Sequence, residues 1–228
     1  MGKEIAAIAE ARGHQIYDRI DIENRESIKS WASDQVDAAI EFTAPDQAFQ
    51  NIKQCLTNGI PVVSGTTGWL QKKAELDQYC HEVNGTYFYA SNYSLGVNIT
   101  FKLNAYLSTI MNRYPDFQVS MKEVHHTEKK DEPSGTAITL ANGIIDHMER
   151  KDRWSLDSHP EPNVLPIESI REGQVPGTHT VKYVSENDEI TLEHKALNRK
   201  GFALGAVLVT EWIQNRKGIL SMDDFLDL

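Results

Sequence analysis

Short apolar segments alternate with helical segments along the first ninety residues, and this alternation constrains the fold more than any other feature of the chain. The strand-like segments are residues 36–42, 61–64 and 87–90, and the helical segments between them are residues 46–56 and 70–83. Strands that alternate with helices of these lengths predict a parallel, doubly wound α/β sheet. In front of them, residues 1–12 are expected to form an amphipathic helix and residues 14–20 another strand.

The second half of the chain has a different order of elements. A helix is expected over residues 95–113, followed by an alternating strand that ends near His125 and by a second helix from Ala137. Further strands are expected at residues 167–170, 178–185 and 189–197, the last two as an antiparallel hairpin, with a polar loop over residues 151–166 and a final helix over residues 201–215. The pattern predicts an α/β domain over the first part of the chain and an α+β domain with a mixed open sheet over residues 95–199.

Composition limits the classes of partner. The 228 residues carry a formal net charge of -10, with 40% hydrophobic and 25% charged residues, which is the balance of a globular protein. Neither a nucleic-acid backbone nor an anionic membrane is expected as a partner, because both would be repelled. No apolar run approaches the ~20 residues of a membrane helix. Cys55 and Cys80 stand alone without a pairing pattern, which indicates a cytoplasmic location.

Three predicted strand ends carry residues typical of ligand sites. Because an open α/β sheet binds its ligands beyond the carboxyl ends of the strands, these ends are expected to line one edge. Each of them taken alone is also typical of an ordinary turn. The residues concerned are Phe42, then Gly65, Thr66 and Thr67, and then Ala90, Ser91, Asn92 and Tyr93.

A polar loop between the strand ending near His125 and the following helix combines proton donors with an anion site. His125, His126 and Lys129 come first, and Ser134 is placed to cap the helix that Gly135 and Thr136 open. Free amides at a helix start attract anions, and a glycine there lets a ligand approach the backbone. This combination predicts chemistry on a small acidic substrate.

Each feature of this loop has an ordinary structural interpretation as well. A pair of histidines at a strand end is commonly solvated or capped, and Ser-Gly-Thr before a helix is a common cap. A metal site is not expected, because no carboxylate or cysteine stands at a recognisable ligand spacing and adjacent strand residues face opposite ways. The combination within one loop is what favours a catalytic interpretation.

The run from His125 to Ala137 closely resembles the signature loop of the 4-hydroxy-tetrahydrodipicolinate reductases, also called dihydrodipicolinate reductases. That family carries His-His-x-x-Lys-x-Asp-x-Pro-Ser-Gly-Thr-Ala, and every fixed position is filled here. The resemblance implies an enzyme of lysine biosynthesis that uses NADH or NADPH to reduce an unsaturated nitrogen ring bearing two carboxylates. It also implies that the end of the chain returns to the first domain, so that residues 1–94 and 200–228 form the dinucleotide-binding domain and residues 95–199 the substrate-binding and tetramerisation domain. The implied assembly is a homotetramer in which open sheets pair.

The resemblance further implies roles for individual residues. His125 and Lys129 are the implied proton donors, and the implied substrate-binding residues are His126, Ser134, Gly135 and Thr136. The residues at the strand ends are implied to bind the cofactor: Gly65, Thr66 and Thr67, together with Ala90, Ser91, Asn92 and Tyr93, would flank the nicotinamide, with Phe42 near it.

The sequence departs from the family at its start. A dinucleotide-binding domain begins with a strand and a Gly-x-Gly-x-x-Gly turn, followed roughly 20 residues later by an acid that binds the ribose. Gly2 matches the last of these glycines and Asp21 the acid, but the strand and the first two glycines do not occur in this sequence. The expected fold is thus a Rossmann-like domain without its first strand, and a start displaced by about a dozen residues is the favoured explanation.

Two other functions stay open on the sequence alone. The absent glycine turn leaves room for a catalytically impaired binding or assembly subunit of the same fold. An oxidoreductase acting on another amino-acid precursor is also conceivable, although the unbroken loop argues against it. Cofactor preference is open too, since Asp21 favours the free ribose of NADH whereas Arg25 suits the 2′-phosphate of NADPH.

Overall fold

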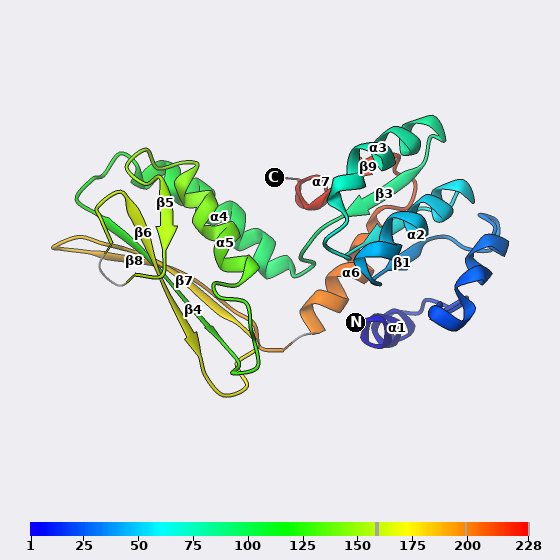
Figure 1. Ribbon diagram of the computed structural model, residues 1–228, viewed down its shortest axis with the longest axis horizontal. Helices are drawn as coiled ribbons and strands as arrows, with labels where there is room; N and C mark the ends of the chain where they lie inside the picture. Colours follow the sequence, from blue (N-terminus) through cyan, green and yellow to red (C-terminus); the bar gives the residue numbers. More distant parts are fainter. Residues whose placement is uncertain (158–159, 199, 228) are drawn as a thin grey trace. The chain divides into compact units, whose positions relative to one another are not determined.

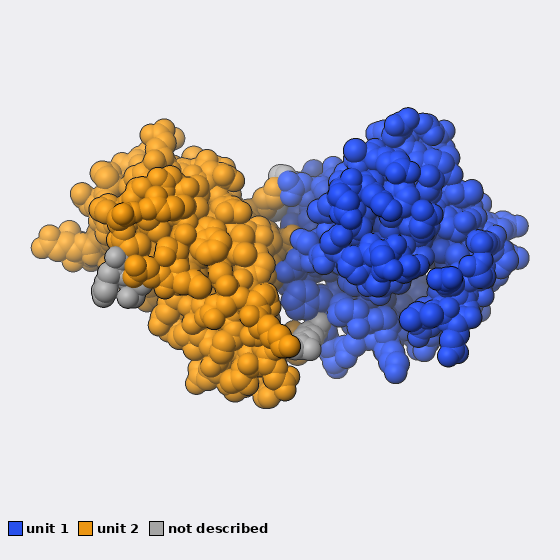
Figure 2. All heavy atoms as spheres, viewed as in Figure 1, with its two compact units in different colours: residues 1–95, 200–228 blue, residues 96–199 orange. Residues whose placement is uncertain are grey.

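The chain forms two compact units in a computed structural model that describes residues 1–157, 160–198 and 200–227 (Figure 1). The first unit consists of Met1–Leu95 and Lys200–Leu228, and the second consists of Gly96–Arg199; Figure 2 colours them separately. None of the helices that the structure describes is long and apolar enough to cross a membrane.

The first unit is built on a four-stranded parallel sheet. Its strands are β1 (Ala39–Glu41), β2 (Val62–Ser64), β3 (Thr86–Tyr89) and β9 (Gly218–Leu220), in the order β1-β2-β3-β9. Every neighbouring pair in this sheet is parallel. The parallel sheet predicted from the strand–helix alternation is therefore confirmed.

Helices cover both faces of this sheet. Because successive strand residues face opposite ways, Val62 and Tyr87 belong to one core cluster while Val63 and Phe88 belong to the other. The first cluster contains side chains of α2 (Pro45–Thr57) and α3 (Lys73–Glu82), which the 3-10 turn η2 (Leu70–Lys72) precedes. The second contains side chains of α1 (Gly2–Ala11), α6 (Lys200–Trp212) and the short α7 (Met222–Leu226).

The strand expected at residues 14–20 does not form. These residues have no regular secondary structure, and the 3-10 helix η1 (Ile22–Ser30) follows them. A β-strand requires a neighbour with which to exchange backbone hydrogen bonds. The described strands of this unit pair only with one another, so the alternating pattern of residues 14–20 is not sufficient to make a strand.

The second unit contains a mixed sheet, as predicted, but with five strands where the sequence predicted four. Its strands are β4 (Gln118–His125), β5 (Arg153–Ser155), β6 (Val164–Arg171), β7 (Thr178–Val184) and β8 (Glu189–Lys195), in the order β5-β6-β4-β7-β8. Strands β5, β6 and β4 are parallel, whereas β4 with β7 and β7 with β8 are antiparallel. The predicted β7–β8 hairpin is thus confirmed.

The polar loop expected over residues 151–166 was partly wrong. It contains β5 and the beginning of β6, while residues 158–159 lie outside the described part of the chain. The apolar side chains of Val164 and Leu165 are buried, and this burial stabilises the start of β6 although the flanking residues are polar.

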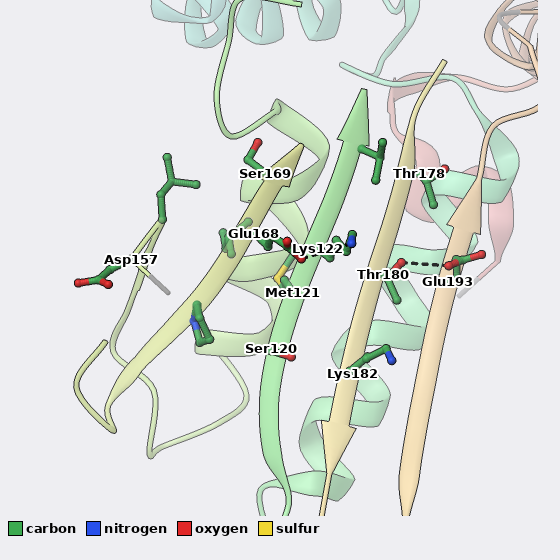
Figure 3. A pocket seen from close by; sticks show the side chains of 14 residues that line it. Ser120, Met121, Lys122, Asp157, Glu168, Ser169, Thr178, Thr180, Lys182 and Glu193 are labelled. Atoms are coloured by element: carbon green, nitrogen blue, oxygen red, sulfur yellow. Dashed lines mark hydrogen bonds and ion pairs between the residues drawn. The ribbon is translucent and has the colours of Figure 1, made fainter. Parts of the chain in front are cut away.

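Helices α4 (Leu95–Met111) and α5 (Gly135–Ile145) contribute to one core cluster with the sheet of the second unit. Met121 and Val181 from the sheet pack in this cluster with Leu140 and Ile144 from α5. On the opposite face, a hollow of about 820 Å³ lies over the central strands, with Lys122, Thr180 and Lys182 among the side chains around it (Figure 3).

Candidate active site

Strand β4 places two functional groups on its buried face. Its burial alternates along the strand, so Glu123 and His125 lie on the same side as the core residues Val119 and Met121. Ser134 follows the loop and caps α5, since its side chain accepts a hydrogen bond from the backbone N–H of Ala137 at 3.2 Å. The predicted helix cap is therefore confirmed.

The carboxylate of Glu123 is the centre of the hydrogen-bond network in this unit. Its side chain is fully buried, and the backbone N–H of Ser134 donates to both of its oxygens at 3.1 Å. The Oε1 atom also accepts from Ser169 Oγ at 2.5 Å and from Arg171 Nη2 at 3.1 Å. Nothing in the sequence of β4 singles out Glu123, because its partners come from two other segments, the start of α5 and the strand β6.

The pKa of Glu123 is lowered even though it is buried. Burial alone raises the pKa of this carboxyl, but hydrogen bonds from Ser134, Ser169 and Arg171 to the charged form outweigh that effect. Glu123 is therefore a carboxylate at neutral pH, and its charge acts on the two histidines beside it.

His179 lies against His125 and was not identified from the sequence. Strands β4 and β7 pair antiparallel with Glu123 opposite His179, and the Nε2 atoms of His125 and His179 are 3.2 Å apart. Ser134 Oγ is 3.1 Å from the same Nε2 of His179. No local motif marks His179, and only the strand register brings it here.

Burial keeps both imidazoles of this pair neutral. It lowers the pKa of His125, an effect that the charge of Glu123 only partly offsets. Burial, together with the neighbouring His125, lowers the pKa of His179 to about 4. Binding of a negatively charged group next to His125 would raise its pKa and favour the imidazolium.

Arg171 fixes the signature loop to the sheet. Besides its ion pair with Glu123, it donates from Nε to the carbonyl oxygen of Lys129 at 3.3 Å and from Nη2 to that of Asp131 at 2.6 Å. The ammonium of Lys129 in turn contacts both carboxylate oxygens of Asp131 at 2.8 Å. The loop backbone is thus held in place while the amine stays partly exposed.

Of the remaining predicted substrate residues, Gly135 and Thr136 open α5, and His126 directly follows β4. Gly135 is exposed, and no heavy atom lies within 4 Å of the position that a Cβ would occupy. Thr136 and His126 are half-buried. The open surface at Gly135 leaves room for a ligand to approach the first amides of the helix.

In the first unit, Glu41 organises two of the predicted cofactor loops. This buried carboxylate accepts hydrogen bonds from Ser64 Oγ at 2.6 Å, from Thr66 Oγ1 at 2.8 Å and from the backbone N–H of Thr43 at 3.0 Å. Thr66 Oγ1 also accepts from the N–H of Thr43 at 2.8 Å. Glu41 thereby connects the ends of β1 and β2 by hydrogen bonds, a role that the sequence pattern did not predict.

Aromatic packing completes this edge of the first unit. The rings of Phe42 and Tyr93 lie 5.5 Å apart, and the Tyr93 hydroxyl donates to the carbonyl of Ser64 at 2.7 Å. A Cβ at Gly65 would lie 2.2 Å from the Phe42 ring, so only glycine fits beneath it. The structure therefore brings Phe42, Gly65, Thr66 and Tyr93 together.

The other predicted cofactor residues are less closely connected. Ala90 is buried, Thr67 and Ser91 are exposed, and Asn92 accepts a hydrogen bond from the backbone N–H of Ser94 at 2.9 Å. Gly2 begins α1. The carboxylate of Asp21 caps η1 by accepting from the N–H of Ile22 at 2.7 Å. Their cofactor roles stay predictions.

Replacing Arg171 should destabilise the second unit. In Arg171→Met the buried charge of Glu123 loses its ion pair, and we expect a loss of about 3 kcal/mol or more in the free energy of unfolding by urea. Because the Glu123 pKa is lowered in the folded state, its contribution is complete above its ordinary value of 4.5 and is lost as the pH falls through the lowered pKa. The difference from the unsubstituted chain should therefore shrink in acid.

A matched control for this experiment is Arg153→Met. Arg153 is half-exposed and pairs with Asp152 and Glu161 at the surface, where ion pairs contribute about 1 kcal/mol or less. Equal losses in the two variants would show that the Glu123–Arg171 pair has no special role.

Comparisons with known proteins identify the family. A family model described as "Dihydrodipicolinate reductase, N-terminus" matches residues 1–93, and one described as "Dihydrodipicolinate reductase, C-terminus" matches residues 96–226. A 4-hydroxy-tetrahydrodipicolinate reductase of Christiangramia forsetii is 44% identical over 228 residues, covering 99% of this chain and 93% of that protein. A protein of the same name from Acinetobacter baumannii is 35% identical over 203 residues, covering 82% of this chain and 73% of its own length.

A solved structure supports the fold. A dipicolinate-bound dihydrodipicolinate reductase from a Paenisporosarcina species superimposes with a TM-score of 0.74 at 22% identity, covering 99% of this chain and 94% of that one. The two family models together span nearly the whole sequence, so this chain belongs to the dihydrodipicolinate reductase family.

Proposed function

We propose that this chain reduces 4-hydroxy-tetrahydrodipicolinate to tetrahydrodipicolinate with NADH or NADPH, in lysine and diaminopimelate biosynthesis. The observation that supports this most strongly is the signature loop, in which His125, Lys129 and the cap of α5 are held together through Glu123 and Arg171. Curated relatives with up to 44% identity carry this activity in their names.

The nicotinamide, when bound, supplies the hydride. The residues that would hold it fit this role, because Glu41 fixes the Thr43 and Thr66 loops at the carboxyl ends of β1 and β2, where open α/β sheets bind nucleotides. We assign the first unit to cofactor binding and the second to substrate binding and assembly. Asp21 and Gly2 are proposed cofactor contacts, as are the residues at the ends of β2 and β3.

The protein must supply the proton that accompanies the hydride. Lys129 carries an ammonium that can donate directly, and His125 can donate once a substrate carboxylate has raised its pKa. The amides of Gly135 and Thr136 would bind one carboxylate at the start of α5. His126 and Ser134 would hold the ring in place. The hydroxyl of the substrate leaves as water.

A direct assay tests this proposal. Oxidation of NADH and of NADPH is followed separately with freshly generated substrate, and the ratio of the two kcat/KM values reports the cofactor preference. Inhibition of turnover by added dipicolinate is a second measurement that reports on the substrate site. Micromolar cofactor binding would count against a binding or assembly subunit, because that alternative rests on the absent glycine turn; the absence of both cofactor binding and turnover would contradict the proposal.

We further propose that four copies assemble through the sheet face of the second unit. This face carries the hollow described above and interleaves cations with carboxylates, since Lys122 pairs with Glu168 at 3.4 Å and Lys182 pairs with Glu189 at 2.9 Å. A face on which positive and negative side chains alternate can pair with the same face of a second copy, because each charge then meets an opposite one.

We also propose a cytoplasmic location for the protein.

A large charged side chain on this face should disrupt assembly. Ser120 lies on the central strand and lines the hollow (Figure 3), so Ser120→Arg should shift the mass in light scattering from that of a tetramer to that of a smaller species. Thr139→Arg, on the exposed side of α5, is the matched control and should leave the mass unchanged. A monomer before any substitution would refute the assembly.

A further inference from the structure

The buried group of Glu123, His125 and His179 has the geometry of a metal site. One ligand atom from each lies within 4.8 Å of the other two, and among the described residues this is the only such set of three or more. The Nε2 atoms of His125 and His179 are 3.2 Å apart, and they lie 3.6 Å and 3.7 Å from Glu123 Oε2. The three atoms therefore form a nearly equilateral triangle.

The size of this triangle matches tetrahedral coordination. Zinc bonds imidazole nitrogen and carboxylate oxygen at about 2.0–2.2 Å, and atoms at the corners of such a tetrahedron lie about 3.3–3.6 Å apart. The measured separations lie close to this range. Two nitrogens and one oxygen favour zinc over magnesium or calcium, which prefer oxygen ligands.

The surroundings hold the ligand atoms in place. Arg171 and Ser169 bind Oε1 of Glu123, whereas Oε2 accepts from the backbone N–H of Ser134 and lies 3.6 Å and 3.7 Å from the two imidazole nitrogens. Ser134 Oγ lies 3.1 Å from His179 Nε2 and contacts the same group of atoms. The charge of Arg171 opposes a second cation nearby, so we expect an affinity well below that of a structural zinc site.

We infer that Glu123, His125 and His179 bind a zinc-class divalent cation, which competes with the reaction by occupying the Nε2 atom of His125. The inhibitory part rests on the proposed function, because it requires His125 to act on the substrate. The sequence argued against a metal here because no carboxylate or cysteine stood at a recognisable ligand spacing and the adjacent His125 and His126 are expected to face opposite ways. The pairing of β4 with β7 supplies the missing ligand, His179.

Calorimetry with zinc chloride tests the site without reference to activity. The chain, stripped with a chelator, should bind one zinc ion per chain and should not bind magnesium. His179→Asn should weaken zinc binding by more than about 100-fold, because the loss of even an outer-shell partner costs about 10–100-fold. His147→Asn is the matched control: His147 lies exposed on the surface, bonded to the carbonyl of Gly143, and its replacement should leave binding unchanged.

Three outcomes would overturn the inference. The first is that the unsubstituted chain does not bind zinc. The second is that His179→Asn binds zinc equally well while its circular dichroism spectrum is unchanged. The third is that the reductase turns over at its full rate when the site is saturated with zinc. In the supporting outcome, zinc inhibits turnover, a chelator restores it, and His147→Asn behaves like the unsubstituted chain. If the stripped chain does not reduce the substrate at all, the proposed function fails while calorimetry still decides the metal site.

Discussion

Replacing Lys129 with alanine should lower kcat by about 100-fold or more while leaving the folded structure intact. A positioned proton donor contributes roughly 10²–10⁴-fold to a rate. The side chain of Lys129 is 22% exposed and its ammonium pairs with the exposed carboxylate of Asp131, so its loss leaves no buried charge unpaired. The thermal midpoint is expected to change little.

The neighbouring lysine provides a control for this result. Lys130 is exposed and carries the same charge one position along the same loop, so Lys130→Ala should retain most of the activity. The measurement is the initial rate at saturating substrate and cofactor for both variants. Undiminished kcat in Lys129→Ala would remove this residue from the reaction, whatever its effect on KM.

Among the glycines of the first unit, Gly205 should be the one at which alanine destabilises the fold most. A Cβ at Gly205 would lie 1.7 Å from the carbonyl oxygen of Tyr93 and 2.8 Å from its carbonyl carbon. Backbone atoms cannot rotate away as a flexible side chain can, so α6 would have to move off the sheet. We expect a loss of about 3 kcal/mol or more in the free energy of unfolding.

The effect should extend to the cofactor loops, because the Tyr93 hydroxyl is bonded to Ser64 at the end of β2. Weakened cofactor binding in calorimetry is therefore expected together with a lower thermal midpoint. Gly201→Ala in the same helix is the matched control: no heavy atom lies within 4 Å of its Cβ position, and alanine favours the helix by roughly 0.5–1 kcal/mol over glycine. Similar destabilisation by both substitutions would contradict the packing argument.

The sequence by itself determined the features that depend on local order. Strand–helix alternation predicted the parallel sheet of the first unit, and Ser134 was correctly placed at the start of α5 because capping involves only the next few residues. The two wrong predictions also came from local patterns. Residues 14–20 alternate like a strand but have no partner strand among the described residues, and the polar composition of residues 151–166 concealed β5.

Only the tertiary structure decided what surrounds the signature loop. Glu123, Arg171 and His179 come from three strands, and the parallel β4–β6 and antiparallel β4–β7 registers bring them together. Glu41 likewise joins two loops more than 20 residues apart. A sequence motif records the residues that neighbour one another along the chain, whereas burial, charge and hydrogen bonding depend on neighbours in space. Strand pairing sets those neighbours. It therefore determines which groups contact His125 and whether its imidazole is protonated.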